Sequence, residues 1–218
     1  EFKAGECIAL IGPNGCGKTT LIKSILGMVL PDSGDILLHD ESILKKFEYR
    51  NTIGYMPQIG RYPDNMTISQ IVEMIKQIRN SKKELDEDLI KTFKLDKMSD
   101  KQMRTLSGGT TQKVSATLAF LFNPDVLILD EPTAGLDPLA AEILKEKIIK
   151  EKNKGKLILI TSHLLSELDD MITQIIFMQD GKVHFHKTIK DLLESTGETK
   201  ISKSIATILK EKQHEQNN

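Results

Sequence analysis

The sequence predicts an α/β protein with a mainly parallel β-sheet, and three observations support this fold class. Strand-like and helix-like segments alternate along most of the 218 residues, as they do where helices connect parallel strands. The apolar runs at 126–129 and 157–160 are unbroken, which is typical of strands covered on both faces. A glycine-rich turn at 12–17 separates a strand signal from a helical pattern.

Two helices can be placed from apolar spacing and end signals. The strand expected at 6–11 leads through the glycine-rich turn into a helix. The apolar face of that helix carries Leu21, Ile22, Ile25 and Leu26. Asp137 and Pro138 are typical of the cap and first turn of a second helix. The inward face of the second helix carries Ile143, Leu144 and Ile148.

Further strands are expected at 126–129 and 156–161, and a hairpin is expected near the end of the sheet. Asp180-Gly181 is a strong hairpin turn signal between strands at 175–178 and 182–185. His184 and His186 lie on one face if that last strand continues. Because two histidines without a third ligand fall short of a usual metal site, a solvated strand is favoured over a metal pair.

Only helical patterns occur from residue 63 to residue 112, which predicts a helical subdomain inserted into the core. Thr67-Ile-Ser-Gln70 is typical of a capping box. The apolar face that follows carries Ile68, Ile71, Val72, Ile75 and Ile78. We therefore expect a single domain, 1–218, whose α/β core comprises 1–62 and 113–197.

Two charged stretches are given no function. Residues 79–88 are expected to be a solvated loop or helix face. The polar tail at 198–218 is expected to be either a surface helix or a frayed end.

Charge and composition exclude several classes of partner. Thirty basic residues nearly balance thirty-one acidic ones, and the net charge of −1 leaves no basic surface for nucleic acid. The longest apolar runs are far below the ~20 residues of a membrane-spanning helix. Two cysteines, Cys7 and Cys16, and no leader-like start indicate a cytosolic protein in a reducing compartment.

The turn between the first strand and helix fits a phosphate-binding loop of the P-loop NTPase type. Its glycines let backbone N–H groups converge on phosphate oxygens, and Lys18 supplies the dominant positive charge. Thr19 is expected to place its hydroxyl on Mg²⁺. A glycine-rich turn without a ligand is the alternative, and the flanking strand and helix disfavour it. The nucleotide-binding residues expected here are Gly12, Pro13, Asn14, Gly15, Cys16, Gly17, Lys18, Thr19 and Thr20. Beside Lys18, the Cys16 thiol is expected to be reactive.

Two carboxylates follow the buried strand at 126–129, at the sheet edge where α/β proteins bind ligands. Asp130 suits Mg²⁺, and Glu131 suits a general base for the attacking water. An apolar strand that ends in acids is common by itself. Together with the phosphate loop, the pair predicts ATP hydrolysis, with Lys18 also in the catalytic set.

Leu106-Ser107-Gly108-Gly109-Thr110 resembles the signature of ABC transporter ATP-binding cassettes, although a helix start after a Gly-Gly turn would be the favoured interpretation of this pentapeptide in isolation. The resemblance implies that Ser107, Gly108 and Gly109 contact the γ-phosphate of ATP held by a second copy of the chain. Thr110 replaces the glutamine usual in the family, so a contact from that glutamine is not expected.

The other motifs of the family follow in order, so the resemblance covers nearly the whole chain. It implies that Gln58 contacts Mg²⁺ and senses the membrane partner, that Asp137 communicates across the dimer, and that His163 contacts the γ-phosphate as a catalytic residue. The expected cofactors are ATP and Mg²⁺, and the expected partners are a transmembrane permease and a second cassette. The chain would then lie on the cytoplasmic face of the cell membrane.

The family's adenine-stacking aromatic residue lies in strands upstream of the phosphate loop, and this chain begins too close to Gly12 to contain it. We therefore expect a truncated amino end and an antiparallel β subdomain of which part is missing. Residues 131–138 resemble the exporter-type subfamily. The alternatives are a non-transport ABC ATPase, disfavoured by the absence of a coiled-coil insertion and a basic face, and a nucleotide switch without turnover, disfavoured by Glu131 and His163.

Overall fold

The computed structural model, which describes residues 1–80, 84–162, 168 and 170–216, confirms the α/β fold with a mainly parallel sheet. The six-stranded sheet has the order β4-β5-β6-β1-β7-β8. Neighbouring strands are parallel from β4 to β7, and β8 is antiparallel to β7. The strands are β1 (Cys7–Ile11), β4 (Ile53–Met56), β5 (Val126–Asp130), β6 (Leu157–Thr161), β7 (Gln174–Gln179) and β8 (Lys182–Thr188).

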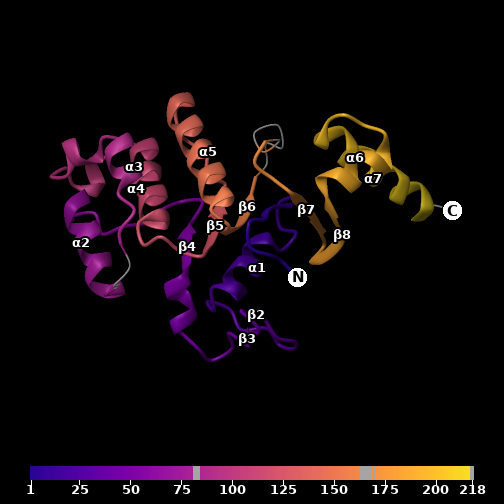
Figure 1. Ribbon diagram of the computed structural model, residues 1–218, viewed down its shortest axis with the longest axis horizontal. Coiled ribbons are helices and arrows are strands. Elements are labelled where there is room, and N and C mark those ends of the chain that lie inside the picture. Colours follow the sequence, from indigo (N-terminus) through magenta and orange to yellow (C-terminus); the bar gives the residue numbers. More distant parts are fainter. Residues whose placement is uncertain (81–83, 163–167, 169, 217–218) are drawn as a thin grey trace.

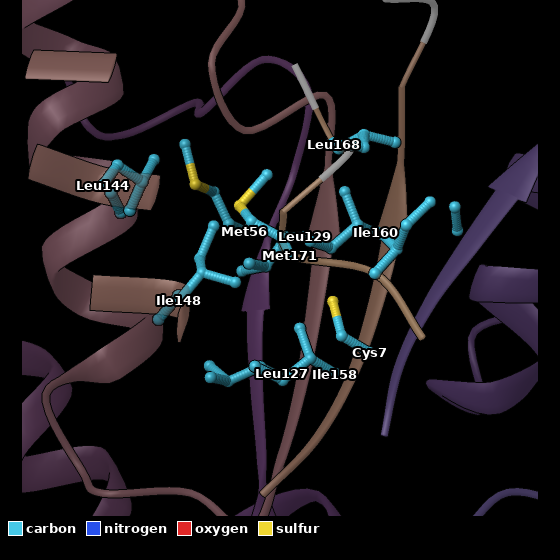
Figure 2. Close-up of a cluster of buried hydrophobic side chains, with 14 of the residues drawn as sticks. Cys7, Met56, Leu127, Leu129, Leu144, Ile148, Ile158, Ile160, Leu168 and Met171 are labelled. Atoms are coloured by element: carbon cyan, nitrogen blue, oxygen red, sulfur yellow. The ribbon is translucent and has the colours of Figure 1, made fainter. Parts of the chain in front are cut away.

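Both faces of the central strands are covered, which explains their unbroken apolar sequences. Along β1, Ile8 and Leu10 pack with Ile22 and Leu26 on the side of α1 (Lys18–Ile25). Cys7 faces the opposite side, where Leu144 and Ile148 of α5 (Pro138–Asn153) meet the sheet (Figure 2). The alternation of side chains along a strand thus divides the core into two layers.

The hairpin turn is confirmed at Asp180 and Gly181, both with positive φ, of 50° and 73°. The strand β8 does extend through both histidines, each of which has a neighbour. The His184 ring meets the Phe177 ring edge-on, and His186 Nε2 lies 2.5 Å from Gln174 Oε1.

A small second sheet is antiparallel and pairs β2 (Leu37–Leu38) with β3 (Glu41–Ser42).

Apart from α1 and α5, which lie beside the sheet, the labelled helices gather in two groups at opposite ends of the molecule (Figure 1). The group at one end comprises α2 (Ile68–Arg79), α3 (Asp88–Thr92) and α4 (Gly108–Phe120), and the group at the other comprises α6 (Ile189–Thr196) and α7 (Ile201–Gln216). Short 3₁₀ turns are η1 (Glu48–Thr52), η2 (Leu95–Met98) and η3 (Met103–Thr105). None of the helices within the described ranges is long and apolar enough to span a membrane.

The capping box is confirmed, since the Thr67 hydroxyl accepts from Gln70 N at 3.2 Å and Gln70 Oε1 accepts from Thr67 N at 2.9 Å. The apolar face of α2 is shorter than predicted, because Ile78 is 70% exposed. The helix α4 runs without a break across the expected boundary at 112/113. The division into an α/β core and a helical subdomain therefore remains a prediction whose second boundary falls inside a helix.

The polar tail was expected to be either a surface helix or a frayed end, and it forms the helix α7 (Ile201–Gln216), one face of which is buried. Ile201, Ile205 and Ile208 of α7 are buried at helical spacing. Ser204 is also buried, and its hydroxyl oxygen accepts a hydrogen bond from Thr196 Oγ1 of α6 at 2.9 Å. The polar composition of the tail did not indicate this buried face, because the few apolar residues are spaced so that they lie on one side of the helix.

The charged stretch at 79–88 is only partly solvated, contrary to prediction. The Lys147 ammonium, almost fully buried on α5, lies 2.7 Å from Asp86 Oδ2 and 3.0 Å from Asp88 Oδ2. It also lies 3.4 Å from the buried Glu151 carboxylate. These ion pairs join the start of α3 and the residues just before it to α5.

Candidate nucleotide site

The phosphate loop, residues 12–19, connects β1 to α1 as predicted. Gly12 has φ 151°, and a Cβ there would lie 2.0 Å from the Met178 carbonyl oxygen, so only glycine fits. Gly17, with φ 101°, caps α1 without a side chain. The first amides of a helix lack intrahelical partners, so this helix start is suited to receive an anion.

Lys18 lies across this loop. Its ammonium donates to Gly12 O at 2.7 Å and to Pro13 O at 3.1 Å. The positive charge is therefore held over the glycine-rich turn, beside the amides of the helix start. This arrangement is suited to the phosphates of a nucleotide.

The structure places the Cys16 thiol in a buried position, which does not favour its predicted reactivity. Its side chain is 3% exposed and packs in the apolar layer with Ile22 and Met178. The sulfur does lie beside the Lys18 ammonium, as expected, at 3.8 Å from Nζ. A neighbouring cation does not make a thiol reactive where reagents cannot reach it.

Asp130 ends β5 and Glu131 follows it, both 8% exposed. Thr161, at the end of β6, holds both residues: its hydroxyl donates to Asp130 Oδ1 at 2.5 Å and accepts from Glu131 N at 3.0 Å. Glu131 has φ 52°, an unusual backbone conformation for a residue that is not glycine. Such outliers persist where surrounding structure maintains them and gather at functional sites.

The order of strands brings these groups to one edge of the sheet. Since β6 lies between β1 and β5, the phosphate loop, Thr161 and Asp130 lie at the carboxyl ends of three neighbouring parallel strands. This edge is where open α/β sheets bind their ligands.

The signature loop, residues 106–110, leads into α4, and Ser107 is its N-cap as predicted. The Ser107 hydroxyl accepts from Thr110 N at 3.3 Å. Space around Gly108 is open, whereas a Cβ on Gly109 would lie 2.9 Å from Gly135 O. The signature loop therefore touches the D-loop, residues 135–137, of its own chain.

Asp137 caps α5, because its Oδ1 accepts from Ala140 N at 2.9 Å. Its other oxygen lies 2.7 Å from the ammonium of Lys113 on α4. The hydrogen bond from Lys113 and that from the Ala140 amide hold the pKa of the Asp137 carboxyl below its usual value. Asp137 is thus an ionised cap tied to the signature helix.

Gln58 follows β4 with an exposed side chain, and its carbonyl accepts from Gln112 Nε2 of α4 at 3.4 Å. The backbone of the Gln58 loop is thereby linked to the signature helix. The remaining candidate, His163, lies outside the described residues.

Two contributors were missed by reasoning from sequence. The Thr161 hydroxyl orients both acids, and Lys113 joins two loops. No local pattern indicates either role, because the partners lie 31 and 24 residues away along the chain.

The phosphate loop, the two acids and the helix start at Ser107 define a phosphate-loop nucleotide-binding protein. Residues 1–134 match the ABC transporter family. The chain therefore belongs to this family, as an ATP-binding cassette.

Curated relatives agree with this assignment. The Nod factor export ATP-binding protein I of Burkholderia orbicola is 33% identical over 187 residues, which cover 84% of this chain and 62% of the relative. An uncharacterized ABC transporter ATP-binding protein of Bacillus subtilis, YhaQ, is 32% identical over 90% of this chain and 67% of its own length. The chain spans about three fifths to two thirds of the curated relatives it matches.

Solved structures share the fold. The ATP-binding subunit of an ABC transporter superposes with a TM-score of 0.88 at 28% identity, covering 95% of this chain and 90% of that one. A dimeric ATP-binding cassette, solved in a post-hydrolysis state with ADP and Pi, has a TM-score of 0.74 at 21% identity. It covers 87% of this chain and 88% of its own.

Proposed function

We propose that this cassette binds Mg²⁺-ATP between two copies of the chain and hydrolyses it to drive substrate movement through a separate transmembrane subunit. The observation that carries the proposal is the meeting of the phosphate loop, Thr161 and Asp130 at three neighbouring strand ends. Export is the favoured direction, since several relatives are named as export ATP-binding proteins.

In this proposal Lys18 moves from the carbonyl oxygens of Gly12 and Pro13 to the phosphates of ATP. Gly12 to Thr20 surround the phosphates, and the residues on the start of α1 donate backbone N–H groups. Glu131 accepts a proton from the attacking water, since its carboxylate follows directly after Asp130. His163 contacts the γ-phosphate, as the family resemblance implies.

The residues proposed for Mg²⁺ are Thr19, Gln58 and Asp130. They offer a hydroxyl, an amide oxygen and a carboxylate, and oxygen ligands of this kind suit this cation. Bound there, Mg²⁺ would neutralise phosphate charge. The Thr161 hydroxyl donates to Asp130 Oδ1 and so restricts the orientation of this carboxylate.

The proposed dimer is head-to-tail and two-fold symmetric. Ser107, Gly108 and Gly109 of one chain would complete the nucleotide site of the other, with Asp137 beside them. The open space at Gly108 supports a close approach by a phosphate. Isologous closure then makes two equivalent sites from one surface.

The transmembrane subunit is proposed to dock beside the Gln58 loop, which would hold the cassette at the cytoplasmic face of the membrane. A groove of about 350 Å³ lies there, lined by Gly60, Arg61, Tyr62, Asp64, Met103 and Thr111. Partly buried Met66 and Met74 pack nearby against the core. Methionines adapt their shape to a partner, which suits a docking helix.

The test uses Glu131→Gln, which keeps the side chain's size and hydrogen bonding but cannot take a proton. Steady-state ATP hydrolysis should fall ~10²–10⁴-fold. ATP binding should survive, so mass in solution should double with Mg²⁺-ATP and return to that of a monomer without it. Wild-type turnover in the variant would remove Glu131 as the base, with His163 the next candidate. A monomer at saturating ATP would contradict the dimer.

A further inference from the structure

An ion pair joins the two loops that the proposed dimer would present to its partner. Lys113 Nζ, on α4 behind the signature loop, lies 2.7 Å from Asp137 Oδ2 in the D-loop. The other oxygen of the same carboxylate, Oδ1, caps α5. One side chain therefore holds the start of α5 and the signature helix together.

Two further contacts surround this ion pair. At Gly109 the signature loop approaches the D-loop so closely that a Cβ would lie 2.9 Å from Gly135 O. The Lys113 ammonium also lies 5.9 Å from the centre of the Phe93 ring, which is buried at the end of α3. From the signature helix, the lysine thus reaches both the D-loop and the end of α3.

We infer that Lys113 is a positioning residue that holds the D-loop and the signature loop of one chain as a single surface for the second cassette. The inference rests on the proposed ATP-dependent dimer and adds to it. An exposed ion pair contributes little to folding stability. Here the ion pair instead raises the fraction of chains that can dimerise, because only the conformation with both loops in place can bind the partner.

Removing the ion pair releases Asp137 from α4, so only a fraction of the chains then hold both loops in the arrangement that can dimerise. The apparent affinity between cassettes falls by that fraction. The dimer contains two copies of the pair, so their effects multiply. An exposed ion pair changes the fraction of dimer-competent chains up to about fivefold. Two copies therefore change the dimer dissociation constant by roughly five- to twentyfold.

The experiment is a double-mutant cycle in the Glu131→Gln background, which retains ATP. The variants are Lys113→Ala, Asp137→Asn and the two together. Asparagine is as good an N-cap as aspartate, so Asp137→Asn removes the charge and keeps the cap on α5. Sedimentation with saturating Mg²⁺-ATP measures the dimer dissociation constant, and a fluorescent nucleotide measures ATP affinity of the monomer.

Each single variant should weaken the dimer roughly five- to twentyfold and leave monomer ATP affinity unchanged. The double variant should be no worse than either single one, since both remove the same link. Lys113→Arg should restore most of the affinity. Lys145→Ala is the matched control: the Lys145 side chain is also 23% exposed and also pairs with an acid, Glu142, but both partners lie within α5. It should leave the dimer unchanged.

Additive losses in the double variant, or a Lys113→Ala dimer as tight as its parent, would overturn the inference. Equal losses in Lys145→Ala would also overturn it, since the effect would then be one of surface charge. If the parent itself stays monomeric with Mg²⁺-ATP, the proposed dimer fails and the inference fails with it. These outcomes separate a failure of the link from a failure of the proposed function.

Discussion

The Thr161 hydroxyl donates to Asp130 Oδ1 at 2.5 Å, across the boundary between β6 and β5. The Thr161 hydroxyl oxygen also accepts from the Glu131 amide at 3.0 Å, and the Thr161 carbonyl oxygen accepts from the same amide at 3.2 Å. One residue therefore determines where both acids lie. Because the Asp130 and Glu131 side chains are both largely buried, small shifts at Thr161 would move the two carboxylates that we propose act on ATP.

Thr161→Val should lower both stability and turnover. Valine keeps the shape but leaves Asp130 without its donor, which should cost about 1–3 kcal/mol of unfolding free energy. Misplaced acids should lower turnover about 10–100-fold. Urea unfolding and steady-state hydrolysis measure the two effects.

Thr173→Val is the matched control for that substitution. Its hydroxyl donates to Cys7 O at 3.1 Å and accepts from Cys7 N at 3.0 Å, at the start of β1 and away from the phosphate loop. It should lose stability while turnover per folded molecule stays the same. Equal losses of turnover in both valine variants would show that Thr161 acts only through stability.

Lys18→Ala should lose nucleotide binding and therefore remain monomeric with ATP. A lysine and a phosphate 4 Å apart at an effective dielectric constant of 20 attract by about 4 kcal/mol before desolvation, so affinity should fall by up to ~10³-fold. Lys23→Ala, on the exposed last turn of the same helix, should bind normally. Calorimetric titration with ATP compares them. Unchanged affinity in Lys18→Ala would remove this lysine from the phosphate site.

Gly108→Ala and Gly109→Ala should fail in different ways. A Cβ at Gly108 meets no atom within 4 Å, so the monomer should keep its stability while the approach of the partner's phosphate is blocked. A Cβ at Gly109 meets Gly135 O at 2.9 Å, so the D-loop must shift and the monomer should lose about 1–3 kcal/mol. Thermal unfolding without ATP and sedimentation with ATP separate the two. A destabilised Gly108→Ala monomer would contradict the open space there.

Acid should weaken the protein partly through Glu151. Burial raises the pKa of its carboxyl, but hydrogen bonds from Lys154 and Lys156 and the charge of Lys147 outweigh it and lower the pKa from 4.5 to about 2. Because the folded pKa is the lower one, this stability is present above about pH 4.5 and is lost as the pH falls toward 2.

Urea midpoints measured between pH 6 and pH 3 test the role of Glu151. Glu151→Gln should be less stable than wild type at pH 6, because Lys147, Lys154 and Lys156 lose their shared partner. Its midpoint should also depend less on pH over this range. Parallel curves for the two proteins would contradict the low pKa.

Local sequence patterns predicted much of the molecule correctly. The glycine turn before Lys18, the capping box at Thr67 and the hairpin at Asp180 each depend on a few neighbouring residues, whose backbone preferences act over short distances. Composition was less useful for α7, where buried Ile201, Ile205 and Ile208 lie within a polar tail. Exposure of the Cys16 thiol could not be predicted either, since it depends on Met178, far along the chain.

By itself the sequence determined the fold class, the phosphate loop and the two acids at the end of and just after β5, because strand periodicity, glycine turns and helix caps are properties of adjacent residues. Only the tertiary structure decided that β6 lies between β1 and β5, and hence that Thr161 holds Asp130. It also decided that Lys113 meets Asp137 and that Lys147 is buried against Asp86. Such contacts depend on how strands and helices pack, and residues distant in sequence meet only once the whole chain has folded.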